Sequence, residues 1–193
     1  EELYERLLKA RGNKPKIVAT LAMVYISNKN FSAKTIPIYK QALESEPGNQ
    51  NLVLCHARAL LDAAQFDAEA RSAYTAALKL HPEPQVLEYA IGLCWKNEGN
   101  MDEAAKSLRA ALRAGHTANP VYAALCDVYL ATDNRTAKAL PIYKQQFSSR
   151  QQDAKFLAVY LDACIDAKQT DSTVESLCHM VLEENPDHVP AYT

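Results

Sequence analysis

The sequence repeats itself internally, and this repetition constrains the fold more than any other feature. Residues 30–41 (NFSAKTIPIYKQ) and 134–145 (NRTAKALPIYKQ) are identical at eight of twelve positions, with a constant offset of 104. The same offset maps Leu21 onto Leu125 and Tyr25 onto Tyr129, so the duplication includes the segment before each match. An offset of 104 is three times about 35, the length of many helix–turn–helix repeats. We therefore expect an array of such repeats.

Dividing the chain at this period predicts five full repeats. They span residues 15–49, 50–84, 85–118, 119–153 and 154–188, with residues 1–14 as the end of a preceding repeat and residues 189–193 as the start of a further helix. We expect a single array over residues 1–193, forming a piece of a longer protein.

Each repeat contains two stretches with the apolar spacing of an amphipathic helix. In the third repeat, Leu87, Ile91 and Trp95 recur at helical spacing before Gly99 interrupts the pattern. Pro37 and Pro141 leave two alternatives open for the second helices of their repeats. If the helix starts early, each proline removes one hydrogen bond of its first turns. If the helix starts later, each proline lies in the first turn, where backbone amides have no partner within the helix, and costs little.

The residues at key positions of these repeats resemble the tetratricopeptide repeat (TPR). The third repeat matches best, with Ile91-Gly92, Trp95, Gly99, Met101, Ala104, Leu108 and Ala111-Leu112, although His116 stands where the family has proline. Four of the five repeats carry one residue more than is usual in the family. The resemblance implies an all-α fold, a right-handed α-solenoid of stacked helix–turn–helix repeats, whose concave face is lined by the first helix of each repeat.

Charge and composition exclude several function classes. Lys and Arg number 21 against 23 Asp and Glu, so the formal charge is −2 and no basic footprint for a polyanion exists. No run of residues approaches the roughly 18 apolar residues of a membrane span. The five cysteines have no metal-ligand spacing and lie in apolar helical stretches, which predicts buried structural thiols and a reducing, cytoplasmic location.

No catalytic constellation stands out from the sequence. The five histidines are scattered, and neither a phosphate-binding loop nor a nucleophile motif occurs. We therefore expect no catalytic residue, no metal site and no cofactor, and we do not expect an enzyme.

Helical spacing within the predicted first helices identifies a candidate binding surface on the concave face. This surface is mostly apolar at its centre, with basic residues near its middle and acidic residues toward its C-terminal end. We expect it to bind an amphipathic helix or an extended peptide. The candidate partner-binding residues are Met23, Ile26, Leu54, Arg58, Leu61, Asp62, Tyr89, Leu93, Lys96, Asn97, Asp127, Leu130, Asp162 and Asp166.

The leading hypothesis is a protein–protein interaction scaffold that binds a peptide or helix of a partner, or another copy of itself. One alternative is RNA binding, because residues 161–167 (LDACIDA) resemble the first helix of a pentatricopeptide repeat. The positions that would read bases lie near the start of each first helix and are mostly apolar, and the net charge also argues against nucleic acid. Another alternative is a regulatory or self-association segment of a larger enzyme.

Overall fold

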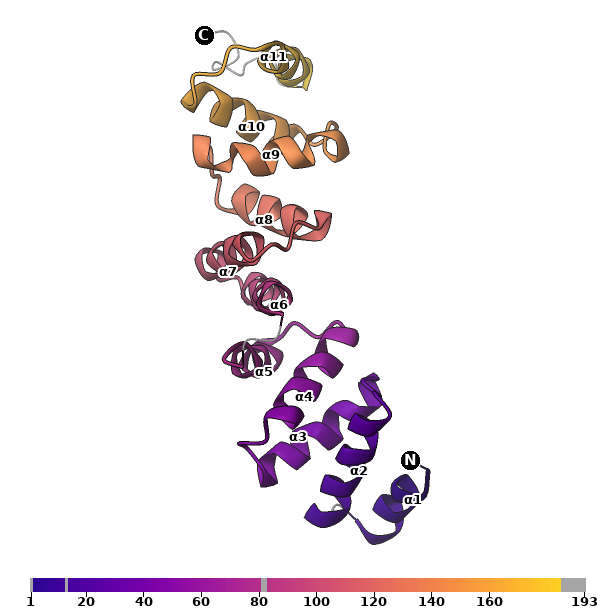
Figure 1. Cartoon of the computed structure of the whole chain (residues 1–193). Coiled ribbons are helices and arrows are strands. Elements are labelled where there is room, and N and C mark those ends of the chain that lie inside the picture. Colours follow the sequence, from indigo (N-terminus) through magenta and orange to yellow (C-terminus); the bar gives the residue numbers. More distant parts are fainter. Residues whose placement is uncertain (1, 13, 81–82, 185–193) are drawn as a thin grey trace. The chain divides into compact units, whose positions relative to one another are not determined.

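The computed structural model describes residues 2–12, 14–80 and 83–184, and the regular structure within these ranges is entirely helical (Figure 1). In the structure the first helices of the five repeats begin at Pro15, Gln50, Pro84, Asn119 and Ala154, the third of them one residue before the predicted start of its repeat at Gln85. The α-helices are α1 (Glu2–Arg11), α2 (Pro15–Ser27), α3 (Ile36–Ser45), α4 (Gln50–Asp62), α5 (Ala68–Leu78), α6 (Pro84–Asn97), α7 (Met101–Arg113), α8 (Asn119–Ala131), α9 (Leu140–Gln146), α10 (Ala154–Asp166) and α11 (Ser172–Glu184).

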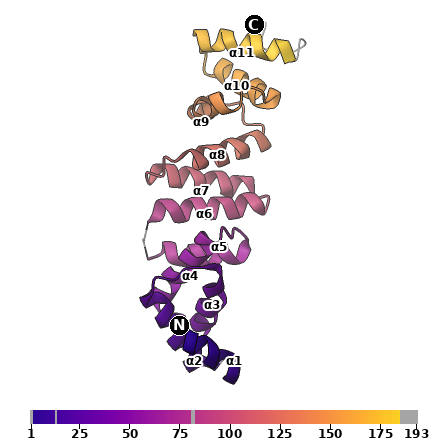
Figure 2. The same cartoon turned by 90° about the vertical axis from the view of Figure 1, so that its right-hand side faces the viewer.

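The chain divides into two compact units, an N-terminal unit (Glu1–Asn100) and a C-terminal unit (Met101–Thr193). Within each unit, every helix packs mainly against the helices that precede and follow it in sequence (Figure 2). The architecture is therefore all-α and consists of stacked helical pairs, as in an α-solenoid.

Small and aromatic residues fill the space between the stacked helices. In the N-terminal unit, Leu21 on α2 and Tyr39 on α3 are fully buried in one cluster, and Tyr74 on α5 is fully buried in the next. In the C-terminal unit, Tyr143 packs edge-on against Phe156, with ring centroids 5.8 Å apart. Because each cluster is shared by neighbouring helices, the apolar stripe of each helix dictates which face turns toward its neighbour.

The first helix of each repeat ends in the same turn. One residue adopts the left-handed conformation, and the next amide donates to a carbonyl five residues back, as Asn30 does to Tyr25 at 2.9 Å. This geometry satisfies carbonyls that the helix end leaves without an internal partner. The left-handed residues are Lys29, Ala64, Gly99, Asp133 and Lys168.

Tyrosines on three second helices tie those helices to the turns. The hydroxyl of Tyr39 donates to the Asn30 carbonyl at 2.8 Å, and Tyr74 and Tyr143 donate in the same way to the carbonyls of Gln65 and Asn134. Each bond spans nine residues, so the same local geometry recurs in the first, second and fourth repeats. The turn and the start of the second helix are thereby fixed together.

The two prolines lie in the first turn of their helices. A short 3-10 turn (Ala33–Thr35) precedes α3, and another (Ala137–Ala139) precedes α9, so Pro37 and Pro141 each occupy an early helical position. The later helix start is therefore confirmed, and each proline avoids the cost it would have in a helix interior.

Candidate functional site

A pocket of about 150 Å³ in the N-terminal unit contains the core of the candidate site. Leu54, Arg58 and Leu61 of α4 line it, and they are also three of the residues selected from the sequence. The remaining lining comes from Ala57 of α4, Ala77 of α5, and Glu83, Val86 and Leu87 at the beginning of α6. The pocket is therefore lined by two successive first helices, α4 and α6, and by the second helix between them, α5.

Helical geometry explains why three separated residues of α4 share this pocket. Leu54, Arg58 and Leu61 are spaced four and three residues apart, which places them on one helical face. His56 and Leu60 of the same helix are buried on other faces. The two pocket leucines are only half-buried, so they present apolar surface that the core has not used.

An ion pair borders the pocket. The Nε of Arg58 donates to Oδ1 of Asp62 at 3.0 Å, one helical turn away, and both side chains are about half exposed. An exposed pair of this kind contributes little to stability, on the order of 0.5 kcal/mol. The guanidinium is therefore available to reorient toward a ligand at small cost.

Further residues extend the apolar surface on α2 and α6. Met23 of α2 is 50% exposed, and Ile26 is half-buried beside it. On α6, Tyr89 and Leu93 are also half-buried, and burial raises the pKa of the Tyr89 hydroxyl, which therefore stays neutral at physiological pH. Lys96 of α6 is half-buried as well. All of these residues belong to the N-terminal unit, like the pocket.

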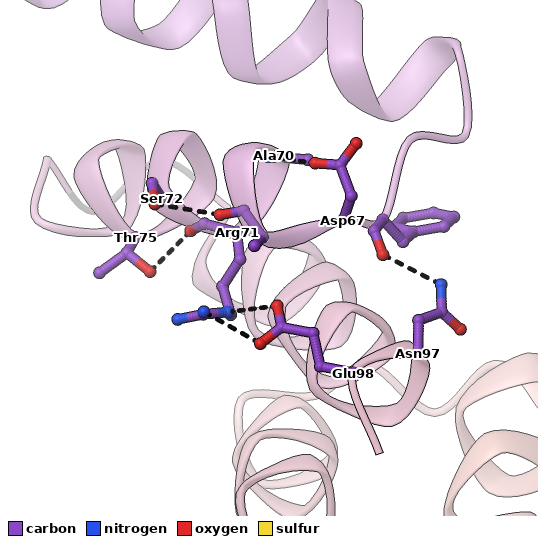
Figure 3. A network of polar contacts seen from close by, with 9 residues as sticks. Asp67, Ala70, Arg71, Ser72, Thr75, Asn97 and Glu98 are labelled. Carbon is purple, nitrogen blue, oxygen red and sulfur yellow. Dashed lines mark hydrogen bonds and ion pairs between the residues drawn. The ribbon is translucent and has the colours of Figure 1, made fainter. Parts of the chain in front are cut away.

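Asn97 has a structural contact of its own. Its Nδ2 donates to the carbonyl oxygen of Phe66 at 3.0 Å, joining the end of α6 to the turn before α5 (Figure 3). Next to it, Arg71 of α5 donates to both carboxylate oxygens of Glu98 at 2.9 and 3.1 Å, and its guanidinium lies 3.6 Å from the ring centroid of Trp95. This network fixes α6 against α5, which are two of the three helices that line the pocket.

The acidic residues selected in the C-terminal unit are engaged within the chain. Asp127 pairs with Arg150, and Asp162 pairs with Arg135. Asp166 accepts a hydrogen bond from the backbone amide of Ala137 at 2.8 Å.

Leu130 departs from its expected position on the binding surface. It is 7% exposed and belongs to the core of the C-terminal unit, so it offers little area to a partner. The predicted acidic end of the surface is thus largely a set of contacts that join neighbouring helices.

The buried cysteines among the described residues carry protonated thiols. Burial raises the pKa of the Cys94 thiol to about 12 and those of Cys126 and Cys164 to about 11, so these three are protonated at neutral pH. Across the described ranges, no group of three or more His, Cys, Asp and Glu side chains is arranged to hold a metal ion. In the same ranges no helix has both the length and the apolar character needed to span a membrane.

Sequence reasoning missed part of the pocket. Glu83 and Val86 line it, but neither was selected from the sequence. Val86 lies three residues before Tyr89, so the helical spacing of α6 was the signal that could have identified it. Glu83 precedes α6 and adopts a left-handed conformation with φ of 43°, which no pattern in the sequence indicated.

Comparison with solved structures identifies the fold. The structure of YrrB, described as a TPR protein with an unusual peptide-binding site, matches with a TM-score of 0.54 over 98% of this chain and 95% of that chain, at 13% identity. The chain has a TPR-like fold. The structure of the MamA protein also matches with a TM-score of 0.54, over 91% of this chain and 93% of that one, at 16% identity. No family model and no curated protein matches the sequence.

Proposed function

We propose that this TPR-like chain is a non-enzymatic scaffold that binds a peptide or helix of a partner protein through its N-terminal unit. The binding surface is the first-helix face, which we define as Met23, Ile26, Leu54, Arg58, Leu61, Asp62, Tyr89 and Leu93. The observation that carries the proposal is the pocket at Leu54, Arg58 and Leu61, because it combines half-buried apolar side chains with an exposed cation at its edge.

The pocket dimensions favour one anchoring side chain. A volume of about 150 Å³ accommodates an apolar side chain, and most of the residues that line the pocket are apolar. Met23, Tyr89 and Leu93 provide further apolar contacts on neighbouring helices, so a partner segment needs several apolar residues on one side. The partner is therefore an amphipathic segment with an apolar anchor, and the Arg58–Asp62 pair selects the charges beside it.

The contacts of the C-terminal unit support this placement. Asp127, Asp162 and Asp166 are bonded to arginines or to a backbone amide of the same chain, so binding a basic partner there would compete with existing contacts. The peptide-binding description of YrrB, a protein with the same fold, also supports a peptide as the partner.

The test is selection of peptides from a random display library on the whole chain, followed by affinity measurement with L61D. A carboxylate at this position replaces apolar pocket wall with a charge that competes with the ligand for Arg58, so we expect at least about tenfold weaker binding, or about 1.4 kcal/mol. I165D is the matched control, because Ile165 is an exposed apolar residue of a first helix in the C-terminal unit. It should bind like the unmodified chain.

Circular dichroism must show equal helicity for both variants. If L61D binds the selected peptides as tightly as the control does, the first-helix face is not the binding surface. Single-stranded RNA in the same assay provides a second comparison, since an interaction sensitive to L61D but specific for RNA would contradict a peptide partner.

A further inference from the structure

A second pocket lies within the C-terminal unit and is built by a different set of helices. It has a volume of about 260 Å³. Leu125 and Tyr129 of α8 are almost fully buried and form its floor. We call it the basic groove and define it by all its lining residues, namely Arg109, Leu112 and Arg113 of α7, Leu125 and Tyr129 of α8, Lys138 of the 3-10 turn before α9, and Pro141 and Ile142 of α9.

The walls of the groove combine apolar area with three cations. Leu112 and Pro141 offer apolar surface on opposite sides. Arg109 and Arg113 are four residues apart on α7, so both side chains lie on the same face, and Lys138 lies on the other wall. All three cations are exposed, and none of the described carboxylates lines the groove.

These three cations differ from the other arginines of the same unit. Arg135 and Arg150 each form an ion pair with an aspartate. Arg109, Arg113 and Lys138 form no ion pair with any residue in the described part of the chain. Acidic residues outnumber basic residues in the C-terminal unit, so three uncompensated cations around one apolar pocket do not follow from composition. The groove is complementary to an anionic ligand with an apolar part.

The groove continues into a more polar hollow of about 280 Å³, and the two share Arg109 and Tyr129. Its polar lining consists of Thr132, Asn134, Lys106 and two carboxylates, Asp102 and Glu103, and Lys106 pairs with Glu103. A ligand that follows both hollows must alternate apolar and polar groups along its length. A peptide segment has this pattern, whereas a lipid chain or a compact anion would match only one of the two hollows.

We propose that the basic groove binds an acidic segment of a partner protein, with one leucine- or phenylalanine-sized side chain inserted between α7 and α9. The carboxylates beside that side chain contact Arg109, Arg113 and Lys138. The following residues lie along the polar hollow and carry no carboxylate, because Asp102 and Glu103 line it. The groove is lined mainly by second helices, so it is a binding surface distinct from the first-helix face and does not depend on the function proposed above.

The experiment compares two triple variants of the whole chain. R109Q/R113Q/K138Q removes the cations of the groove, and K144Q/K155Q/K168Q removes the same charge from exposed positions of the same unit outside the groove. A random peptide display library is selected on the unmodified chain, and each enriched peptide is then measured against both variants by fluorescence anisotropy.

We expect the selection to enrich peptides that combine acidic and apolar residues. These peptides should bind the groove variant at least about tenfold more weakly than the unmodified chain, and the matched variant less than about twofold more weakly. Their affinity should also fall as salt is raised. L112Q should weaken the same peptides while leaving their salt dependence in place, because it removes apolar contact and no charge.

Two outcomes would overturn the proposal. The first is that no enriched peptide distinguishes the two triple variants, or that the peptides which do so are basic or uncharged. The second concerns vesicles that contain phosphatidylserine. If these sediment the unmodified chain but not the groove variant, while no peptide depends on the groove, then the ligand is a membrane surface and the peptide proposal is wrong.

Discussion

His56 on α4 is 6% exposed, and its Nε2 atom has no hydrogen-bond partner among the described residues. Burial lowers the pKa of this imidazole below its ordinary value of 6.5, and Lys40 acts in the same direction while Glu69 opposes it. The unfolded chain therefore binds a proton more readily than the folded chain does. The stability contributed by neutral His56 is complete above about pH 6.5 and is lost as the pH falls below that value.

We accordingly expect the urea midpoint to decrease between pH 7.5 and 5.5, and to decrease less in H56Q. The difference between the two chains isolates His56 from the carboxylates, which both chains share. An equal decrease in both would show that His56 does not cause the pH dependence.

Arg71 gives a second prediction at the scale of single residues. Its planar guanidinium binds Glu98 through two hydrogen bonds and stacks on Trp95, and lysine reproduces the charge but not this geometry. R71K should lower the free energy of unfolding by about 1 kcal/mol. R58K is the control at the exposed Arg58–Asp62 pair and should change it by less than about 0.5 kcal/mol. Urea unfolding measures both, and similar losses would contradict the network in Figure 3.

Single residues also show where prediction from the sequence succeeds. The common face of Leu54, Arg58 and Leu61 follows from helical spacing alone, so it was predictable. The ion pairs of Asp127 and Asp162 join residues 23 and 27 positions apart, and they depend on how neighbouring helices stack. Spacing within one helix does not reveal ion pairs with a neighbouring helix. The sequence therefore places these aspartates on the binding surface, and their pairing is visible only in the structure.

At the scale of elements, the repeated turn makes a paired prediction about the left-handed position. Gly99 has φ of 79° and Ala64 has φ of 51° at equivalent positions. A Cβ atom at Gly99 would meet nothing within 4 Å, so the backbone conformation alone sets its cost. G99A should destabilise the chain by about 1 kcal/mol, and A64G should be neutral or stabilise it by a few tenths of a kcal/mol. Thermal unfolding of both variants tests this, and stabilisation by G99A would exclude the conformational explanation.

The elements themselves were largely predictable, and their connections were less so. The duplication, with its period of about 35 residues, indicated where first helices begin. The 3-10 turns before α3 and α9 could not be placed from the repeat period. Ser32 and Thr136 precede these turns, and their hydroxyls donate to the side-chain oxygens of Asn30 and Asn134, at 2.9 and 2.7 Å. Such local competition for hydrogen bonds is decided by turn geometry and not by periodicity.

At the scale of the whole molecule, stability is expected to be local. Each helix packs mainly on its neighbours in sequence, so a repeat is stabilised by itself and by the repeats beside it. A cavity made in one unit should therefore reduce protection from hydrogen exchange most strongly in the helices next to it.

Leu161 and Leu21 provide a matched pair for this test. Both are fully buried leucines of first helices, on α10 and α2, and truncating either to alanine should cost about 2–5 kcal/mol locally. Since α10 packs on α8, α9 and α11, L161A should reduce amide protection in α9 to α11 and leave α2 to α4 nearly unchanged. L21A should produce the reverse pattern, because α2 packs on α1 and α3. Hydrogen exchange measured by mass spectrometry distinguishes the two patterns, and an equal loss in every helix for both variants would mean that the array unfolds as a single cooperative structure.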